Sequence, residues 1–410
     1  MKILQLSTND LSGGAAKAAF RLHTALKNNG VESYMFVQRK QSNDKTVLGA
    51  KSNLFYRGIN YLRGKIDHFP KKSYFSRQIV PWSINWLPNP FLIRKIRRID
   101  PDIIHLHWIN GGFIPINSLK KILKLKKPIV WTLHDSWTFT GGCHIPHDCK
   151  KYEQQCGKCP LLGSNKDYDL SRIIWLKKKK EFDKVNMTFV TPSIWLKNCA
   201  KNSSLLKNKK VIIIPNFVDI DKFKNVDKNL ARKKLGLSKN KKYLLFGAMS
   251  ATTDKNKGFD LLLKSLQALK NTKNIELLVF GNKALVEINT KIPIHFFGRI
   301  NNMKMLNELY SASDVTIVPS KSENFPNIIL ESFSSGTPCV AFNIGGIPDI
   351  IDHKVNGYLA KPFDVKDLAK GIKFCLLEKN LGENARDKMI NEYTQKIQVK
   401  KYRDLYQELI

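Results

Sequence analysis

The chain has 410 residues, of which 42% are hydrophobic and 25% are charged, close to the averages of folded, water-soluble proteins. This composition argues against a disordered or fibrous chain, and the length favours two domains over one. The 69 Lys and Arg outnumber the 34 Asp and Glu, and the net charge of +35 indicates an anionic partner, either nucleic acid or an anionic membrane surface.

No stretch of the sequence reaches the roughly 18 to 20 uncharged apolar residues that a membrane-spanning helix requires. The apolar residues after Lys2 end at Asn9 and Asp10, too soon for a secretory signal. We therefore expect a cytoplasmic protein with reduced cysteines. Its surface lysines would allow peripheral binding to the inner face of the cytoplasmic membrane.

The first half of the chain alternates strand and helix patterns. Residues 2–7 form a buried-strand pattern, which leads into a glycine turn at 12–14 and an alanine-rich helix at 15–27. Further strands are predicted at residues 31–38, 102–108 and 128–133. This alternation is typical of a parallel sheet that is covered by helices on both faces.

The same alternation starts again after a connecting region at residues 193–221. Strands are predicted at residues 243–247, 275–281, 295–298, 314–319 and 338–342, and helices at 259–269 and 303–311. The sequence thus predicts an α/β protein with two doubly wound Rossmann-like domains, at residues 1–195 and 196–385, and a C-terminal helix at 386–410 that packs back on the first domain. Because parallel sheets bind ligands outside the carboxyl ends of their strands, we expect both domains to face a central cleft.

Four cysteines follow the strand at residues 128–133, with two histidines close to them. The thiols belong to Cys143, Cys149, Cys156 and Cys159, and the last two form a Cys-x-x-Cys pair. Four thiols this close in sequence can supply the complete tetrahedral shell of a structural zinc ion. Unbound thiols and a redox disulfide are the alternatives.

Two glutamates flank the expected start of a helix after the strand at residues 314–319. Pro326 suits a first helical turn, which leaves Glu323 in the preceding loop and puts Glu331 roughly 7 to 8 Å further along the helix axis. The two carboxylates can therefore contact different ends of one ligand, while the amides at the helix start can bind an anion. The alternative is a capped surface helix with incidental carboxylates.

This segment resembles glycosyltransferase family 4, whose signature is two Glu separated by seven residues in such a loop and helix, followed by a Gly-x-Pro turn, here at residues 336–338. Residues 345–349 and 356–358 match two further glycine elements of the family, although Asp349 replaces the more usual Glu. The resemblance covers nearly the whole chain and implies the GT-B fold.

The resemblance also implies how a donor is bound. Glu323 would hold the donor sugar, Glu331 the ribose, and the segment Asn324, Phe325, Pro326 and Asn327 would offer backbone amides to sugar and phosphate. Lys257 matches the lysine that neutralises the pyrophosphate, with a solvated helix-start residue as the alternative. The family's second cation, an arginine, is replaced by Ala248 or Met249, so Lys255 or Arg299 would substitute for it.

In the first domain, the resemblance points to Gly14 and His134. Gly14 lies in the glycine turn after the first strand, where backbone amides can approach a phosphate or an acceptor. His134 ends the strand at residues 128–133 and would contact the donor sugar. His105 and His107 are expected to shape the sheet edge and the acceptor pocket.

These features predict a retaining glycosyltransferase that moves a hexose from a nucleoside-diphosphate sugar to a lipid-linked saccharide of surface-polysaccharide assembly. We expect His134, Lys257 and Glu323 to be catalytic. No Asp-x-Asp metal motif is evident near the expected donor site, so cations and helix amides would stabilise the diphosphate without a cofactor. The alternatives are a GT-B nucleotide-sugar epimerase, against which the Glu pair argues, and a basic nucleic-acid-binding protein, which would need an Arg-rich or aromatic reading face that is not evident.

Overall fold

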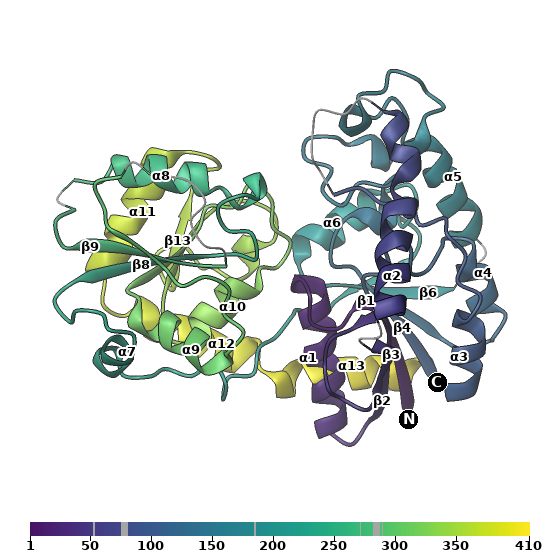
Figure 1. Cartoon of the computed structure of the whole chain (residues 1–410), viewed down its shortest axis with the longest axis horizontal. Helices are drawn as coiled ribbons and strands as arrows, with labels where there is room; N and C mark the ends of the chain where they lie inside the picture. Colours follow the sequence, from purple (N-terminus) through teal and green to yellow (C-terminus); the bar gives the residue numbers. More distant parts are fainter. Residues whose placement is uncertain (52–53, 75–80, 184–185, 271, 282–287, 289) are drawn as a thin grey trace. The chain divides into compact units, whose positions relative to one another are not determined.

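The computed structural model describes residues 1–410 except 52–53, 75–80, 184–185, 271, 282–287 and 289 (Figure 1). The chain forms two compact units. Unit 1 comprises Met1–Pro215 and Val399–Ile410, and unit 2 comprises Asn216–Gln398. None of the helices in the described residues is both long enough and apolar enough to span a bilayer.

Unit 1 contains a seven-stranded sheet in the order β3-β2-β1-β4-β5-β6-β7, and all its neighbouring strands pair in parallel. The strands are β1 Lys2–Asn9, β2 Glu32–Lys40, β3 Val47–Lys51, β4 Ile103–Leu106, β5 Ile129–Thr132, β6 Met187–Thr191 and β7 Lys210–Ile213. Its helices are α1 Gly14–Asn28, α2 Leu54–Asp67, α3 Leu92–Ile99, α4 Ser118–Leu123, α5 Leu170–Phe182 and α6 Ile194–Asn202, with short 3₁₀ turns η1 Phe69–Ser73, η2 Trp137–Phe139, η3 Lys151–Glu153 and η4 Pro160–Leu162.

Successive side chains along the strands of this sheet point to opposite faces, and both faces are packed. Met35 and Val37 of β2 pack against Ala19 of α1, whereas Phe36 joins the larger core cluster that includes Leu92 of α3. Figure 1 shows α1 on one side of the sheet and α3 and α4 on the other. The sheet is therefore buried between two helical layers, as expected for parallel strands.

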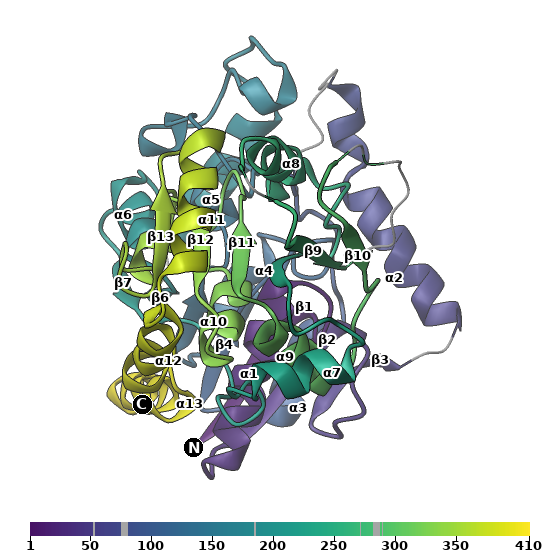
Figure 2. The ribbon, with the colours of Figure 1, turned by 90° about the vertical axis from the view of Figure 1, so that its left-hand side faces the viewer.

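Unit 2 contains a six-stranded parallel sheet in the order β10-β9-β8-β11-β12-β13, seen strand beside strand in Figure 2. The strands are β8 Lys242–Gly247, β9 Ile275–Phe280, β10 Ile294–Phe296, β11 Val315–Val318, β12 Cys339–Phe342 and β13 Gly357–Ala360. The helices are α7 Lys228–Lys234, α8 Phe259–Gln267, α9 Met303–Ala312, α10 Asn327–Ser334, α11 Val365–Leu377 and α12 Leu381–Glu392, with the 3₁₀ turns η5 Lys255–Lys257 and η6 Ile347–Asp349. Helix α13, Gln395–Leu409, begins in unit 2 and continues into unit 1. Two core clusters lie on the two faces of the sheet.

The prediction of two doubly wound α/β domains is confirmed, and the central cleft stays a prediction. The units divide between Pro215 and Asn216, not at residue 195, because β7 pairs in parallel with β6 and so extends the first sheet. The C-terminal segment is two helices, α12 and α13, and only the residues from Val399 onward belong to unit 1.

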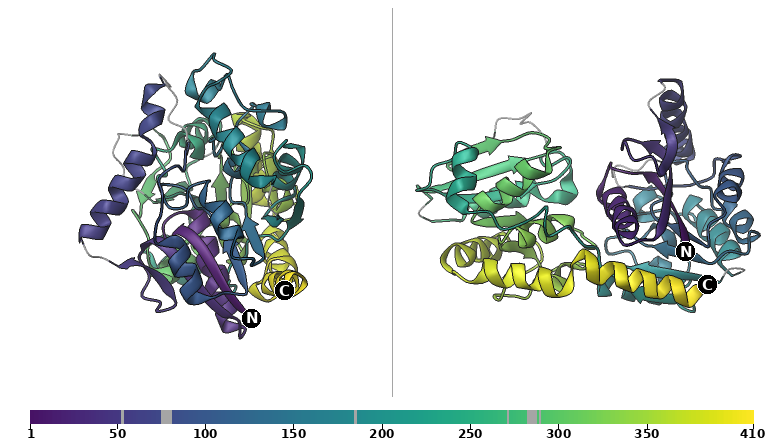
Figure 3. Two further views of the ribbon diagram at one scale, coloured as in Figure 1. Left: turned by 90° about the vertical axis from the view of Figure 1, so that its right-hand side faces the viewer. Right: turned by 90° about the horizontal axis from the view of Figure 1, so that it is seen from below.

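Helix α13, drawn in yellow in Figure 3, is held to unit 1 by two buried tyrosines. The Tyr406 hydroxyl lies 2.7 Å from Nδ1 of His105, and the Tyr402 hydroxyl lies 3.1 Å from Oγ1 of Thr132. Both contacts satisfy polar groups that burial would otherwise leave without partners.

Candidate active site

Lys257 and Glu323, two of the predicted donor residues, form an ion pair in unit 2. The Lys257 Nζ lies 2.7 Å from Oε1 of Glu323, and their side chains are 30% and 14% exposed. Attraction by the Glu323 carboxylate raises the pKa of Lys257, although burial opposes the rise. Lys257 therefore stays protonated, and its positive charge lies beside a partly exposed carboxylate.

A close approach between two loops makes this pair possible. The backbone N–H of Lys321 donates to the carbonyl of Asn256 at 2.8 Å, and the Asn256 side-chain amide donates to the carbonyl of Ser322 at 3.0 Å. Gly258 has a φ of +70°, and a Cβ at this position would lie 1.9 Å from the carbonyl oxygen of Pro319. Only glycine allows the two loops to approach this closely.

A glycine turn fixes the backbone of Glu323 from the other side. Gly345 has a φ of +54°, and a Cβ there would lie 1.9 Å from the carbonyl oxygen of Glu323. The N–H of Gly346 donates to the same oxygen at 3.2 Å. The Gly-Gly element of the sequence therefore positions the carboxylate-bearing loop.

Helix α10 carries the second glutamate. Pro326 is the N-cap, one residue before the helix, and Glu331 is buried within α10, where its Oε2 accepts a hydrogen bond of 3.0 Å from the Tyr310 hydroxyl. The side chain of Phe325 is buried against Tyr393, with ring centroids 5.6 Å apart. Any contact of Phe325 with a donor would therefore use its backbone.

Arg299, a candidate for the second cation, follows a loop whose backbone contacts the turn at Gly281. The N–H of Gly281 donates to the carbonyl of Gly298 at 2.7 Å, and a Cβ on Gly281 would lie 1.6 Å from the carbonyl oxygen of Ala248. The ends of β8, β9 and β10 therefore converge here. Arg299 follows Gly298 directly and is exposed.

In unit 1, the glycine turn opens helix α1. Gly13 is the N-cap with a φ of +97°, and a Cβ there would meet no atom within 4 Å. Gly14 is the first helical residue, and the first turn contains no acidic side chain. The helix start therefore combines open space with backbone amides, the arrangement that favours an anion.

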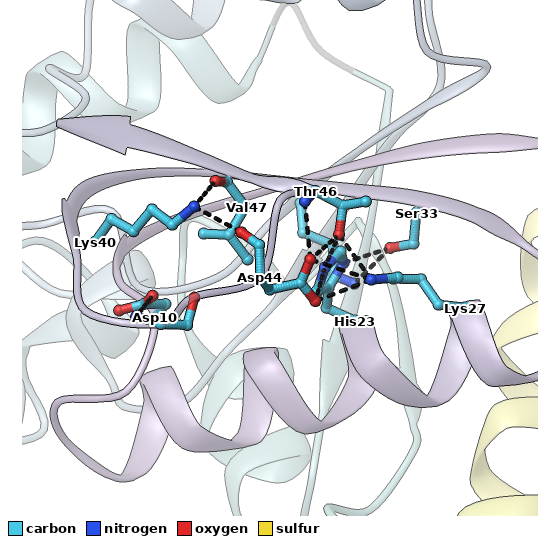
Figure 4. Close-up of polar contacts among 10 residues, drawn as sticks. Asp10, His23, Lys27, Ser33, Lys40, Asp44, Thr46 and Val47 are labelled. Carbon is cyan, nitrogen blue, oxygen red and sulfur yellow. Dashed lines mark hydrogen bonds and ion pairs between the residues drawn. The ribbon is translucent and has the colours of Figure 1, made fainter. Parts of the chain in front are cut away.

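Asp10 and His23 make polar contacts beside this turn and in the helix that follows it (Figure 4). The Asp10 carboxylate accepts hydrogen bonds from the backbone N–H groups of Gln41 and Ser42, at 2.9 and 2.8 Å. In α1, His23 contacts the hydroxyls of Ser33 and Thr46, each at 2.9 Å. Short-range spacing could not reveal these partners, because they come from β2 and the loop after it.

His134 belongs to a chain of buried polar groups. Its Nε2 lies 3.1 Å from Nδ1 of His107, whose Nε2 lies 2.9 Å from Oε1 of Gln5. The Gln5 amide nitrogen donates to Ser33, so the Gln5 oxygen must accept from His107. His107 then accepts at Nδ1, and His134 donates through Nε2–H.

Burial lowers the pKa of His134 to about 4, so this imidazole is neutral at pH 7. His134 can therefore offer hydrogen bonds but not a positive charge. His105 is fully buried, with its ring nitrogens beside Tyr406 and Thr132. Its ring lies against that of His107, with centroids 4.1 Å apart.

The four clustered cysteines of unit 1 line one cavity of about 20 Å³. Cys143, Cys156 and Cys159 are buried, and Cys149 is half-buried. Among the described residues, no group of three or more His, Cys, Asp or Glu is already arranged to hold a metal ion. The structure thus gathers the predicted thiols without presenting a finished metal shell.

Two family models match this chain. Residues 12–222, more than half of the chain, match Glycosyltransferase Family 4, and residues 227–396 match Glycosyl transferases group 1. These matches favour neither an epimerase nor a nucleic-acid-binding protein.

The chain is also similar to curated and solved proteins. It is 25% identical to the N-acetyl-alpha-D-glucosaminyl L-malate synthase of Bacillus anthracis, over 77% of this chain and 76% of that protein. It is 25% identical to the putative colanic acid biosynthesis glycosyl transferase WcaC of Escherichia coli, over 83% of each chain. The solved structure of Anabaena HepE in complex with UDP covers all of both chains with a TM-score of 0.67 and 15% identity. Two parallel-sheet α/β domains, the family models and these neighbours agree, and the chain therefore belongs to glycosyltransferase family 4, as a GT-B glycosyltransferase of group 1.

Proposed function

We propose that this glycosyltransferase moves a hexose from a nucleoside-diphosphate sugar to a hydroxyl of a lipid-linked saccharide, with retention of configuration at the anomeric carbon. The observation that carries the proposal is the Lys257–Glu323 ion pair beside the start of α10. The structurally similar HepE was solved with UDP, with UDP and glucose, and with UDP-glucose, which supports a nucleotide-sugar donor.

Donor binding would exchange one anion for another at Lys257. A diphosphate carries more negative charge than one carboxylate, so it can replace Glu323 as the partner of the lysine. The displaced Glu323 carboxylate is then able to accept hydrogen bonds from sugar hydroxyls. The amides at the start of α10 add hydrogen-bond donors for the phosphate, and Glu331 would hold the ribose.

In the transfer step, the bond between the anomeric carbon and the diphosphate oxygen breaks, and a bond from the acceptor oxygen to the same carbon forms on the same face. The proton of the acceptor hydroxyl passes to the departing diphosphate. Lys257, with Arg299 as the proposed second cation, stabilises the charge that grows on this diphosphate. We propose that these groups act without a catalytic metal ion, and that His134 contributes a neutral hydrogen bond to the donor sugar.

An exposed aromatic and basic surface on α2 and η1 supports a membrane-bound acceptor. This α2–η1 surface comprises Tyr61, Leu62, Lys65, Ile66, Phe69 and Lys72. Tyr61 is 57% exposed and Phe69 is 66% exposed, and each ring has a lysine ammonium within 6 Å of its centroid. Aromatic rings with nearby cations are suited to the interface of an anionic bilayer. We propose that this surface holds the enzyme at the inner face of the cytoplasmic membrane.

The test is a transfer assay with a panel of UDP- and GDP-hexoses and extracted lipid-linked saccharides. We expect release of nucleoside diphosphate coupled to sugar transfer, a product with the anomeric configuration of the donor, and no stimulation by Mg²⁺ after chelation. Lys257→Ala should slow both release and transfer by a factor on the order of 10² or more. A product of inverted configuration, or transfer at the unmodified rate by Lys257→Ala, would contradict the proposal.

A further inference from the structure

The cavity lined by four cysteines is separate from every residue proposed above for donor binding. It lies in unit 1 between the segment after β5 and helix α5, and its walls include Thr140, Gly141 and Ser171. Its volume of about 20 Å³ is just enough for one water-sized species. Four thiols at so small a cavity are suited to a single ion and leave no room for an organic ligand.

A backbone amide points at one of the sulfurs. The N–H of Gly141 donates to Sγ of Cys156 at 3.1 Å, whereas the N–H of Leu162 donates to the backbone carbonyl of Cys159 at 3.1 Å. A Cβ on Gly141 would lie 2.7 Å from Cβ of Cys156, so only glycine brings its amide this close. Hydrogen bonds of this kind stabilise a thiolate more than a thiol.

A buried lysine supplies positive charge at the same place. Lys178 of α5 is fully buried, and its Nζ donates to the carbonyls of Trp137 and Thr140 and lies 3.5 Å from the Trp137 ring centroid. Cys156, Cys143 and Asp135 all lie close enough to attract this ammonium when they are ionised. Anionic neighbours stabilise a buried ammonium, and metal-bound thiolates would add to the charge of Asp135.

The nearby histidines and redox chemistry fit these observations less well. His144 uses Nδ1 for Asp135 at 2.6 Å and Nε2 for Ser83 at 2.8 Å, and His147 is exposed. All seven cysteines are free thiols, and none is joined to another as a disulfide.

We propose that Cys143, Cys149, Cys156 and Cys159 bind one Zn²⁺ ion as four thiolates. The four thiols release their protons to solvent, and the ion with four thiolates carries a net charge of −2, which Lys178 and the Gly141 amide offset. As they stand, the described thiols are not arranged around a metal position, so the ion must draw them inward; half-buried Cys149 has the most freedom to move. Zinc would then fasten together the segment between β5 and helix α5.

Metal analysis of the full chain from zinc-replete medium tests this site. We expect about one zinc per chain, lost in Cys156→Ala and in Cys159→Ala and retained in the control Cys375→Ala, which removes a buried thiol of unit 2. The zinc-loaded protein should protect four of its seven thiols from modification until the ion is removed.

If the cysteine variants fail to fold, cobalt binding to the unmodified chain tests the proposed metal site. Cobalt added to the unmodified, chelated chain should give the intense visible bands of tetrahedral thiolate coordination. Absence of zinc from the purified chain, together with no such bands on cobalt addition, would overturn the proposal. Transfer activity does not enter this measurement, so the zinc site and the proposed donor site succeed or fail independently.

Discussion

Lys257 and Glu323 neutralise each other in the structure, so a donor diphosphate must displace the carboxylate before the lysine can bind it. This exchange gives the two residues different roles. Removal of the lysine and removal of the carboxylate should affect the affinity for free nucleoside diphosphate differently. The lysine attracts the diphosphate, and the carboxylate competes with it.

Replacement of Lys257 by Ala should lower turnover by a factor on the order of 10² or more, because a preorganised cation at a leaving group stabilises charge in the transition state. Affinity for free nucleoside diphosphate should fall as well. Glu323→Gln should leave that affinity unchanged or higher, while turnover and the choice of sugar suffer. Calorimetry with UDP or GDP, together with the transfer assay, distinguishes these outcomes.

Lys264→Ala is the control, since it removes an exposed lysine of helix α8, which follows the same 3₁₀ turn. Its affinity for nucleoside diphosphate should stay near that of the unmodified chain. Weaker nucleotide binding by Glu323→Gln than by Lys257→Ala would show that the ion pair does not have the proposed role.

At the scale of elements, two glycines with the same backbone angle have different surroundings. Gly258 and Gly236 have φ values of +70° and +69°, but a Cβ at Gly236 would meet no atom within 4 Å. Gly236→Ala should therefore cost only the left-handed backbone strain, about 1–2 kcal/mol. Gly258→Ala should cost more, because its Cβ must push the loop at Pro319 away, and it should also weaken nucleotide binding. Urea unfolding and calorimetry compare the two variants; equal losses in both would contradict the close approach.

The α2–η1 surface leads to a second prediction at this scale. We expect the chain to bind vesicles that contain anionic lipid in a salt-sensitive way, and neutral vesicles little. The double variant Leu62→Ser with Phe69→Ser should bind less. Phe363→Ser, which removes an exposed aromatic ring of unit 2, is the control and should bind normally. Equal sedimentation with anionic and neutral vesicles would leave this surface without a membrane role.

The sequence predicted the alternating elements well, because buried strands and amphipathic helices have local patterns. Strands β3, β6, β7 and β13 were missed, since short runs such as Lys210–Ile213 are hard to separate from the connections around them. The Lys257–Glu323 pair and the contact between His107 and His134 could not be predicted from spacing alone. Both depend on how distant loops and strands meet, as at Gly258 and Pro319.

On the scale of the whole molecule, buried histidines make stability depend on pH. Burial lowers the pKa of His23 to about 4 and that of His105 to about 3, from an ordinary value of 6.5 in an unfolded chain. Between about pH 4 and 6.5 the unfolded chain therefore binds more protons than the folded chain. The free energy of unfolding should be fully present above pH 6.5 and should fall as the pH drops through this window.

Urea unfolding at pH 7.5 and pH 5 measures this loss. In His105→Gln, whose amide can still bond to Tyr406 and Thr132, the difference between the two pH values should be smaller. His295→Asn, a change at an exposed histidine of unit 2, is the control and should leave the difference unchanged. An unaltered pH dependence in His105→Gln would contradict the assignment.

The return of residues 399–410 to unit 1 has a consequence for synthesis on the ribosome. Translation runs toward the C-terminus, so all of unit 2 is made before Tyr402 and Tyr406 leave the exit tunnel. Until then, buried His105 and Thr132 lack their tyrosine partners, and the nascent unit 1 cannot complete its packing. Unit 2, continuous in sequence from Asn216 to Gln398, can therefore finish folding before the unit whose synthesis began first.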